Sequence, residues 1–376
     1  MKYIVREIQK HIEKQFFKGK AIVIYGARQV GKTTLVKILQ EKYNKALYIN
    51  CDEIDMRQAL QDKTSTELKS LFGNNNLIII DEAQRVKNIG LTIKLIVDNY
   101  PELQIIATGS SSFELSGEIK EPLTGRKYEF FLYPFSYKEL LQLYSKIEFK
   151  RLLELRIIYG MYPSIVDSNN VSELKLLADS YLYKDIFQYQ NIKNSELLMR
   201  LLQALALQIG NEVSYNELAS IVGVDKNTII SYINILEKAF IIFRLQPFSR
   251  NIRNELKKMR KIYFYDTGIR NALINNLNLL SLRQDAGALF ENFMIAERIK
   301  FNSNSQLNKN YYCWRTHTQK EIDYLEEFNG VIKAFEFKFN KQALKFPQEF
   351  LDVYENSTIE LINKDNFEGF LGEGGL

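Results

Sequence analysis

Short apolar runs alternate with longer stretches of helical apolar spacing in the first third of the chain. The runs occupy residues 21–25, 45–50, 77–80, 103–107 and 128–132. Their composition is typical of strands buried on both faces. Parallel strands need crossover connections, which the helical stretches between the runs supply. The alternation therefore predicts an α/β domain, a parallel sheet with helices on both faces.

From Pro134 the pattern changes to helical spacing without intervening strands. The helical stretches cover residues 136–144, 149–159, 171–187 and 196–209. The first opens with a serine that is followed three residues later by a glutamate, a capping box that favours a helix start. We therefore expect a helical segment after the sheet domain.

Residues 214–245 predict two short helices followed by a strand. Ser214 and Asp225 cap the two helices, and a glycine turn joins them. With the strand at 241–245, the pattern resembles a winged helix-turn-helix. Such modules bind DNA or pack against protein, and the sequence leaves both roles open.

The last third combines one helix with several strands. A helix around residues 289–293 precedes a strand at 311–315 and two apolar-rich runs at 321–325 and 331–339. The Asn-Gly pair between these two runs is typical of a tight hairpin turn. We therefore expect the two runs to pair as adjacent antiparallel strands.

A phosphate-binding loop follows the first apolar run. Residues 26–33 read Gly-Ala-Arg-Gln-Val-Gly-Lys-Thr, so backbone N–H groups and a helix N-terminus converge where a polyphosphate can bind. Lys32 would contact the β- and γ-phosphates, and Thr33 would bind Mg²⁺. An ordinary glycine turn is the plainer alternative. The expected nucleotide-binding residues are Gly26, Ala27, Arg28, Gln29, Val30, Gly31, Lys32, Thr33 and Thr34.

Two carboxylates follow the run at 77–80. Ligands of open α/β sheets bind at the carboxyl ends of strands, so Asp81 would hold Mg²⁺ and Glu82 would orient and deprotonate the attacking water. Apolar runs that end in Asp-Glu also enter solvated turns. Thr108 and Ser110 end the next strand and are equal candidates for a polar contact to the γ-phosphate, although small polar residues also form ordinary loops.

Two arginines are candidates for stabilising charge on the transferred phosphoryl group. Arg28 lies inside the loop, and Arg126 ends the sequence Leu-Thr-Gly-Arg before the fifth apolar run. Either residue could equally be a surface arginine.

Composition limits the chemistry. The chain has 376 residues, 46% of them apolar, which is enough for two or three domains. Cys51 and Cys313 lie far apart, which predicts neither a disulfide framework nor a zinc site. With two histidines in the chain, metal chemistry would depend on carboxylates. No apolar run approaches membrane-spanning length and the N-terminus lacks a signal-peptide core, so we expect a cytoplasmic protein without membrane contact.

Positive charge is concentrated between Arg244 and Lys261. This segment holds seven basic residues and one acidic residue, whereas the whole chain carries a net charge of +5. Such a segment attracts phosphate backbones without regard to sequence, so DNA is the expected partner. A charged run is also typical of a solvated surface. A homo-oligomer is compatible with the sequence.

Charged residues flank the Asn-Gly turn near the C-terminus. A hairpin would bring Asp323 and Glu336 together on adjacent strands, with Lys338 on the same face as Glu336. Two carboxylates for Mg²⁺ beside a lysine are the minimum for a metal-dependent phosphodiesterase. Alternating charges also occur on the wet face of any strand, but the apolar flanks of residues 336–338 favour a cleft.

The ordered motifs resemble a known family. GARQVGKTTL, LIIIDEAQ, ATGSSSFEL, LTGR and YPFSYKEL, followed by KIYFYDTGIRNAL, LFENFMIAE, EIDYL and EFKF, are similar to prokaryotic AAA+ superfamily "predicted ATPase" proteins. In that family an AAA-type domain is joined to a winged helix and a restriction-endonuclease-like, PD-(D/E)xK-type domain. The resemblance implies ATP and Mg²⁺ as cofactors. It also adds Glu291 to the nuclease-like site, as a metal ligand beside Asp323 and Glu336.

The expected fold class is therefore α/β, with a P-loop AAA-type parallel sheet followed by helical, winged-helix and restriction-endonuclease-like parts. The expected domain limits are 1–135 for the ATPase, 136–195 for the helical segment, 196–265 for the winged helix and 266–376 for the nuclease-like domain.

Two functions are compatible with these observations. In the first, an ATPase with catalytic Lys32 and Glu82 binds DNA and gates metal-dependent cleavage by Asp323, Glu336 and Lys338. In the second, ATP controls a switch or scaffold whose nuclease-like domain binds DNA or protein without cutting, since fold does not establish activity. A small-molecule kinase is disfavoured by the chain length and by the winged-helix pattern.

Overall fold

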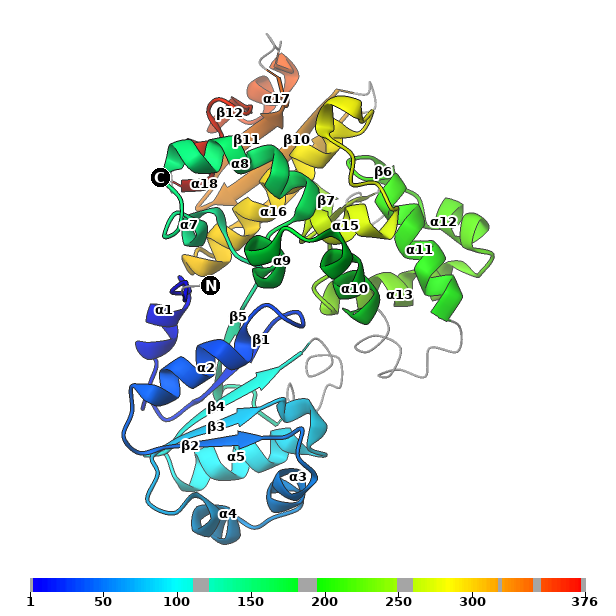
Figure 1. Ribbon diagram of the computed structural model, residues 1–376. Coiled ribbons are helices and arrows are strands. Elements are labelled where there is room, and N and C mark those ends of the chain that lie inside the picture. The colour runs from blue at the N-terminus through cyan, green and yellow to red at the C-terminus, as the bar shows by residue number, and fades with distance from the viewer. Residues whose placement is uncertain are drawn as a thin grey trace.

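Two sheets organise the part of the chain that the computed structural model describes, namely residues 3–110, 122–181, 195–248, 260–316, 320–340 and 346–372. A five-stranded sheet lies in the N-terminal third, and a seven-stranded sheet is built from the second half. Figure 1 shows the first sheet in blue and cyan, with the second sheet on the opposite side of a layer of helices.

The N-terminal sheet is parallel throughout, as the alternating pattern predicted, with strand order β2-β3-β4-β1-β5. Every residue of its three central strands is buried, because helices cover both faces. The strands are β1 (Ala21–Tyr25), β2 (Ala46–Asn50), β3 (Leu77–Asp81), β4 (Gln104–Gly109) and β5 (Lys127–Phe131).

The connections explain why both faces are covered. The chain crosses the sheet in one direction from β1 to β2 and returns in the other through β3 and β4, so right-handed crossovers place the helices on opposite faces. Figure 1 shows α2 on one side and α3, α4 and α5 on the other. The helices of this part are α1 (Gln9–Glu13), α2 (Lys32–Glu41), α3 (Ile54–Leu60), α4 (Ser65–Phe72), η1 (Ala83–Arg85) and α5 (Ile89–Asn99).

Helices follow the sheet, as expected. The predicted capping box is confirmed, because Ser136 Oγ accepts from the backbone N–H of Glu139 and Glu139 Oε2 accepts from that of Ser136. Residues 182–187 of the predicted helix at 171–187 lie outside the described residues. The helices are α7 (Tyr137–Leu140), α8 (Lys146–Tyr159), α9 (Pro163–Ser168), α10 (Val171–Tyr181) and α11 (Ser195–Leu207).

A pair of short helices and three strands come next. Ser214 and Asp225 each cap a helix as predicted, and Gly223 adopts a φ of 80° in the turn between the helices. The strand β8 had no sequence signal of its own within the basic segment. The elements are β6 (Glu212–Val213), α12 (Tyr215–Val222), α13 (Lys226–Lys238), β7 (Ile242–Pro247) and β8 (Arg260–Phe264). The winged-helix assignment stays a prediction.

The C-terminal part contains the predicted hairpin. Phe328 pairs with Val331 across the two-residue turn, where Asn329 and Gly330 both have positive φ. The elements are α15 (Thr267–Leu273), η3 (Leu280–Leu282), α16 (Ala286–Asn304), β9 (Asn310–Arg315), β10 (Glu321–Phe328), β11 (Val331–Phe337), α17 (Gln348–Val353), β12 (Ser357–Ile362) and α18 (Phe367–Gly372).

One continuous sheet crosses the predicted domain limit at residue 265. Its order is β12-β11-β10-β9-β7-β8-β6, and the junction is a parallel pairing of β7 with β9 at Gln246–Tyr312 and Pro247–Cys313. The helix-pair region and the C-terminal region therefore share a sheet, although the four domain limits themselves stay predictions. No helix in the described ranges is both long and apolar enough to cross a membrane.

Candidate functional site

The loop at residues 26–31 has its shape fixed by two glycines. A Cβ at Gly26 would lie 2.2 Å from the carbonyl oxygen of Leu132, so the close packing of β1 and β5 admits no side chain there. Gly31 adopts a φ of 97° directly before α2, a left-handed conformation that favours glycine. The loop thus leads from a buried strand into a helix N-terminus, the geometry that phosphate binding requires.

Lys32 is held inside this loop. Its side chain is buried, and Nζ donates to the carbonyl oxygens of Gly26 at 2.9 Å and Ala27 at 2.8 Å. The ammonium group therefore lies at the mouth of the strand-to-helix turn, among the backbone groups predicted to surround a phosphate.

Arg6 lies outside the loop, hydrogen-bonds to it, and is not predicted from the sequence. Its guanidinium donates to the carbonyl oxygens of Val30 at 2.7 Å and Tyr133 at 2.6 Å, and to Glu139 Oε1 at 2.8 Å. Arg6 and Glu139 are both buried. No local motif marks Arg6, because its partners lie 24 to 133 residues away along the chain.

Asp81 collects hydroxyl groups from three elements. Oδ2 accepts from Thr33 Oγ1 at 2.8 Å and from the Tyr48 hydroxyl at 2.6 Å, and Oδ1 accepts from the Thr108 hydroxyl. Its carboxylate and the Thr33 hydroxyl are hard oxygen donors of the kind that Mg²⁺ prefers. The residues present fit the ion expected here, and Thr33 and Asp81 would hold it. Tyr48 was not predicted, since nothing local distinguishes a tyrosine on β2.

Glu82 and Gln84 lie at the same edge of the sheet. Glu82 has a φ of 54°, uncommon for a residue with a side chain, and its N–H donates to Thr108 Oγ1 at 3.2 Å. The Gln84 amide donates to the Glu82 carboxylate and, at 3.2 Å, to Ser110 Oγ. Gln84 Oε1 is buried and has no hydrogen-bond partner within the described part of the chain. The two candidates at the end of β4 therefore have different partners. Thr108, within the strand, contacts Asp81, and Ser110, directly after it, contacts Gln84.

The two candidate arginines lie in different places. Arg28 is half-buried within the loop. Arg126 directly precedes β5 and forms an ion pair with Asp98 at 2.6 Å. Because β5 is parallel to β1, Arg126 lies at the amino ends of the strands, about five residues or roughly 16 Å from the loop edge. The structure does not bring Arg126 to the nucleotide loop of the same chain.

The second predicted site is assembled on the large sheet. Tyr324 pairs with Phe335, which places Asp323 on β10 beside Glu336 on β11. Lys338 Nζ lies 4.0 Å from Glu336 Oε2. Glu291, on α16, joins the same cluster, because it and Asp323 both form ion pairs with one buried lysine. The structure thus brings the four predicted residues together.

That shared cation is Lys261, on β8. Its buried Nζ lies 3.3 Å from Glu291 Oε1 and 3.2 Å from Asp323 Oδ1. The Tyr263 hydroxyl also donates to Glu291, and the N–H of Phe337 donates to Asp323 Oδ2 at 3.1 Å. From the sequence, Lys261 is one of the basic residues of a charged segment, because a strand in a basic run gives no sign of burial.

Burial dominates the electrostatics of this carboxylate cluster. Burial and the neighbouring Asp323 charge raise the pKa of Glu291 to about 7 and that of Glu336 to about 9. Burial acts to lower the pKa of Lys261, but the charges of Glu291 and Asp323 outweigh it and raise the pKa. The lysine is therefore a permanent cation between two acids.

The cluster does not fit the Mg²⁺ site that the resemblance implies. Among the residues described, no group of three or more His, Cys, Asp or Glu side chains is arranged to hold a metal ion. An ammonium group takes one oxygen from each of Glu291 and Asp323, and a backbone N–H takes the other oxygen of Asp323.

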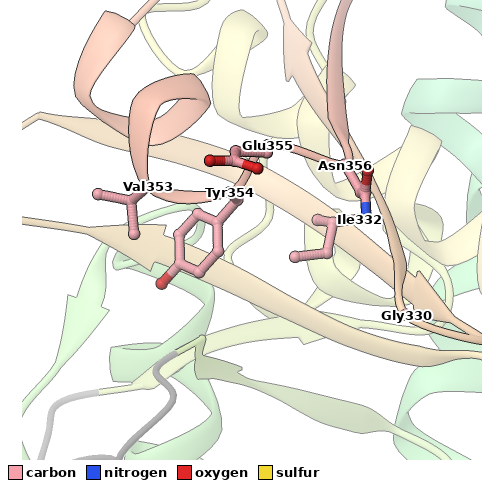
Figure 2. Close-up of a pocket in the computed structure, with 6 residues that line it drawn as sticks. All are labelled: Gly330, Ile332, Val353, Tyr354, Glu355 and Asn356. Carbon is pink, nitrogen blue, oxygen red and sulfur yellow. The ribbon is translucent and has the colours of Figure 1, made fainter.

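A separate pocket of about 300 Å³ opens near the hairpin turn. It is lined by Gly330, Ile332, Val353, Tyr354, Glu355 and Asn356. Figure 2 shows the Val353, Tyr354 and Glu355 side chains at the end of α17 and Ile332 on the neighbouring strand. The pocket lies at the turn end of β10 and β11, whereas Asp323 and Glu336 lie at the other end. It contains none of the predicted site residues.

Comparison with protein families divides the chain in three. Residues 18–141 match a family described as an AAA domain. Residues 150–280 and 286–366 match families described as domains of unknown function, DUF8612 and DUF4143 respectively. The chain thus contains an AAA domain and a DUF4143-type C-terminal part, joined in a mixed α/β structure.

Several prokaryotic proteins are similar over most of the chain. Uncharacterized protein MJ1544 of Methanocaldococcus jannaschii is 28% identical, over 90% of this chain and 82% of that protein. An uncharacterized protein of Haemophilus influenzae is 24% identical, over 94% and 88% of the two chains. Uncharacterized protein Rv2008c of Mycobacterium tuberculosis is 25% identical, over 89% and 73%.

Similarity to solved structures is slight. The Pif1 helicase of Candida albicans gives a TM-score of 0.28 at 15% identity, over 47% of this chain and 48% of that chain. The Drosophila ORC structure bound to AT-rich DNA and Cdc6 gives 0.25 at 8% identity, over 71% and 92%.

Proposed function

We propose that the N-terminal domain hydrolyses ATP with Mg²⁺. The observation that carries this proposal is the convergence of the 26–33 loop with Asp81 and Glu82 at one edge of a parallel sheet, where Thr33 donates to Asp81 at 2.8 Å. Thr33 and Asp81 would hold Mg²⁺, which would supply positive charge against the negative charge that develops during phosphoryl transfer. Lys32 would exchange the carbonyl oxygens of its own loop for phosphate oxygens.

Glu82 is the proposed general base. Its backbone is fixed by the N–H bond to Thr108, and its carboxylate by the Gln84 amide. A carboxylate held at the carboxyl end of β3 can orient a water molecule toward the γ-phosphate and accept its proton. The free acceptor Gln84 Oε1 is placed to help fix that water.

An apolar cavity beside the loop supports a purine nucleotide. It measures about 240 Å³ and is lined by Tyr3, Ile4, Arg6, Val30, Gly31, Thr34, Phe135 and Pro163. Aromatic and aliphatic walls next to a phosphate loop suit a flat heterocycle. We therefore propose that the base binds between Tyr3 and Phe135 while the phosphates extend over Gly31.

The proposal is tested by turnover and binding of two variants. Lys32→Ala should abolish ATP hydrolysis. Glu82→Gln should retain binding of a fluorescent ATP analogue and lose turnover by at least about 100-fold, the usual contribution of general-base catalysis. Turnover at the wild-type rate in either variant would refute the proposal.

DNA is the second proposed ligand, and the structure narrows the surface that could bind it. The three described basic residues of the segment have internal partners, and Arg260 lies over the Tyr215 ring. Lys261 lies in the carboxylate cluster, and Arg244 bonds Glu237 at 2.7 Å and Asn234 at 3.0 Å. Four of the seven basic residues, Arg250, Arg253, Lys257 and Lys258, belong to residues 249–259, which lie outside the described residues.

The test for DNA is a mobility shift at several salt concentrations. The logarithm of the DNA-binding constant falls linearly with the logarithm of the salt concentration. The magnitude of the slope is close to the number of phosphates that the protein contacts. Replacing Arg250, Arg253, Lys257 and Lys258 with serine should weaken binding for all sequences. Unchanged affinity in that variant would exclude this segment as the DNA contact.

For the C-terminal part, the internal cation favours a switch or scaffold over a nuclease. We therefore propose that ATP turnover controls the binding of DNA or protein by this domain. In the arrangement seen, the domain does not cleave DNA. Incubation of plasmid DNA with Mg²⁺ or Mn²⁺, with and without ATP, distinguishes the two. Cutting that disappears in Lys338→Ala would restore the nuclease hypothesis.

A further inference from the structure

Lys261 reaches the carboxylate cluster from a neighbouring part of the fold. On β8 it pairs with Leu245 of β7 and with Glu212 of β6, so its backbone is fixed on both sides. Its side chain crosses to Glu291 on α16 and Asp323 on β10. The shared sheet therefore fixes the position of the buried ammonium group.

We infer that Lys261 is the resident cation of the C-terminal carboxylate cluster and excludes a divalent metal ion from it. The inference concerns the cluster alone and does not depend on ATP hydrolysis by the N-terminal domain.

The contacts leave little room for another cation. Lys261 occupies the space between Glu291 and Asp323, and it repels any ion that approaches the same oxygens. Asp323 directs one oxygen to Lys261 and the other to the N–H of Phe337. Glu291 Oε1 accepts from both Lys261 and Tyr263. A metal ion would have to displace a buried ammonium group, which would itself then lack a partner.

The charges also explain why the arrangement is stable. Two buried carboxylates repel each other, and a buried ammonium group without a partner is unfavourable. When the lysine lies between the carboxylates, its attraction to both offsets the repulsion and the cost of burial. Tyr263 and Phe337 supply the additional hydrogen bonds that a buried ion pair needs. Removing the lysine should leave vacant carboxylate oxygens that prefer a hard divalent cation.

Mn²⁺ binding to the full-length, nucleotide-free chain tests the inference. Free Mn²⁺ is measured by electron paramagnetic resonance for the wild type, Asp323→Asn, Lys261→Met and the Lys261→Met/Asp323→Asn double variant. Each protein is compared with its counterpart that carries Asp323→Asn. The difference gives the Mn²⁺ bound at the cluster, because any binding near Asp81 is common to all four proteins.

The wild type and Asp323→Asn should bind the same amount of Mn²⁺. Lys261→Met should gain one site, and the double variant should lose it again. Mn²⁺ should also raise the melting temperature of Lys261→Met but not that of the double variant, since ligands stabilise the state that binds them.

Lys300→Met is the matched control. Lys300 is likewise a buried lysine, 2.6 Å from Glu297 on the same helix as Glu291, but it is not part of the cluster. Its variant should be destabilised without gaining a Mn²⁺ site.

Two results would overturn the inference. One is a Mn²⁺ site in the wild type that Asp323→Asn removes, a comparison that needs no lysine variant to fold. The other is a folded Lys261→Met protein that gains no site.

Discussion

Asp81 depends on residues that the loop motif does not contain. Three hydroxyl groups, from Thr33, Tyr48 and Thr108, donate to its two carboxylate oxygens. Hydrogen bonds to a charged group contribute about 1.5–3 kcal/mol each. The orientation of the proposed Mg²⁺ ligand is thus set jointly by α2, β2 and β4.

Tyr48→Phe should therefore weaken the response to Mg²⁺. We expect the Mg²⁺ concentration for half-maximal ATP hydrolysis to rise about tenfold, equivalent to about 1.4 kcal/mol. The measurement is the hydrolysis rate across a Mg²⁺ titration. Tyr43→Phe is the control, because the Tyr43 ring packs on Phe16 and contacts none of these groups. An unaltered titration in Tyr48→Phe would contradict the role given to its hydroxyl.

At the residue scale, local chemistry was predictable and long-range partners were not. Gly26, Lys32 and Thr33 are recognisable because strand, loop and helix are consecutive in the chain, and Asp81 because it directly follows an apolar run. Arg6 and Lys261 are not, because a buried ion pair has no signature in the sequence around either partner. A lysine within a basic run gives no indication that it faces inward.

At the scale of elements, the short helix α7 has two roles. Its capping box is local, but Glu139 within that box also binds Arg6, which in turn holds the Val30 carbonyl of the nucleotide loop. The helix start is therefore linked to the loop by a single buried ion pair.

Arg6→Met should lower the free energy of unfolding by about 3 kcal/mol, because it leaves the Glu139 carboxylate buried without its cation. Urea unfolding followed by circular dichroism measures the change. Lys42→Met removes the half-exposed partner of Glu13 and should cost less than about 1 kcal/mol. Equal losses in the two variants would argue against a special role for Arg6.

The pairing of α16 with β10 should make stability depend on acid pH. Arg298 forms two bonds to Glu326, at 2.8 and 2.9 Å. Burial acts to raise the pKa of Glu326, but Arg298 outweighs it and lowers the pKa from 4.5 to about 2. Since the folded state binds this proton more weakly than the unfolded state, the contribution is complete above about pH 4.5 and is lost as the pH falls toward 2.

Glu326→Gln should accordingly be less stable than the wild type by about 3 kcal/mol at pH 7. The difference should narrow between about pH 4.5 and 2. Denaturant unfolding at a series of pH values checks this, and a constant difference over that range would show that the ion pair is not its source.

The organisation of the whole molecule is only partly predictable from the sequence. The parallel sheet, the helical segment and the hairpin at residues 329–330 were all expected and are confirmed. The pairing of β7 with β9 could not be predicted, because it joins strands about 65 residues apart through only two residue pairs. Without that pairing, the sequence indicates independent domains on either side of residue 265.

A fragment comprising residues 266–376 should therefore fold poorly. It would expose β9 as an edge and leave Glu291 and Asp323 without Lys261 and Tyr263. We expect a broad thermal transition and aggregation, measured by calorimetry and light scattering. A fragment comprising residues 195–376 retains β7 and β8 and is the matched comparison. A cooperative transition in the shorter fragment would show that the shared sheet is dispensable.

The shared sheet also constrains how such chains can be recombined. Exchange of C-terminal parts between relatives at residue 265 would take Lys261 from one parent and its partners Glu291 and Asp323 from the other. The buried charges would then balance only if both parents carry the same residues at these positions. A crossover before β6 keeps all of these partners together. Natural or engineered hybrids should consequently tolerate junctions near residue 195 far better than junctions at the boundary that sequence motifs suggest.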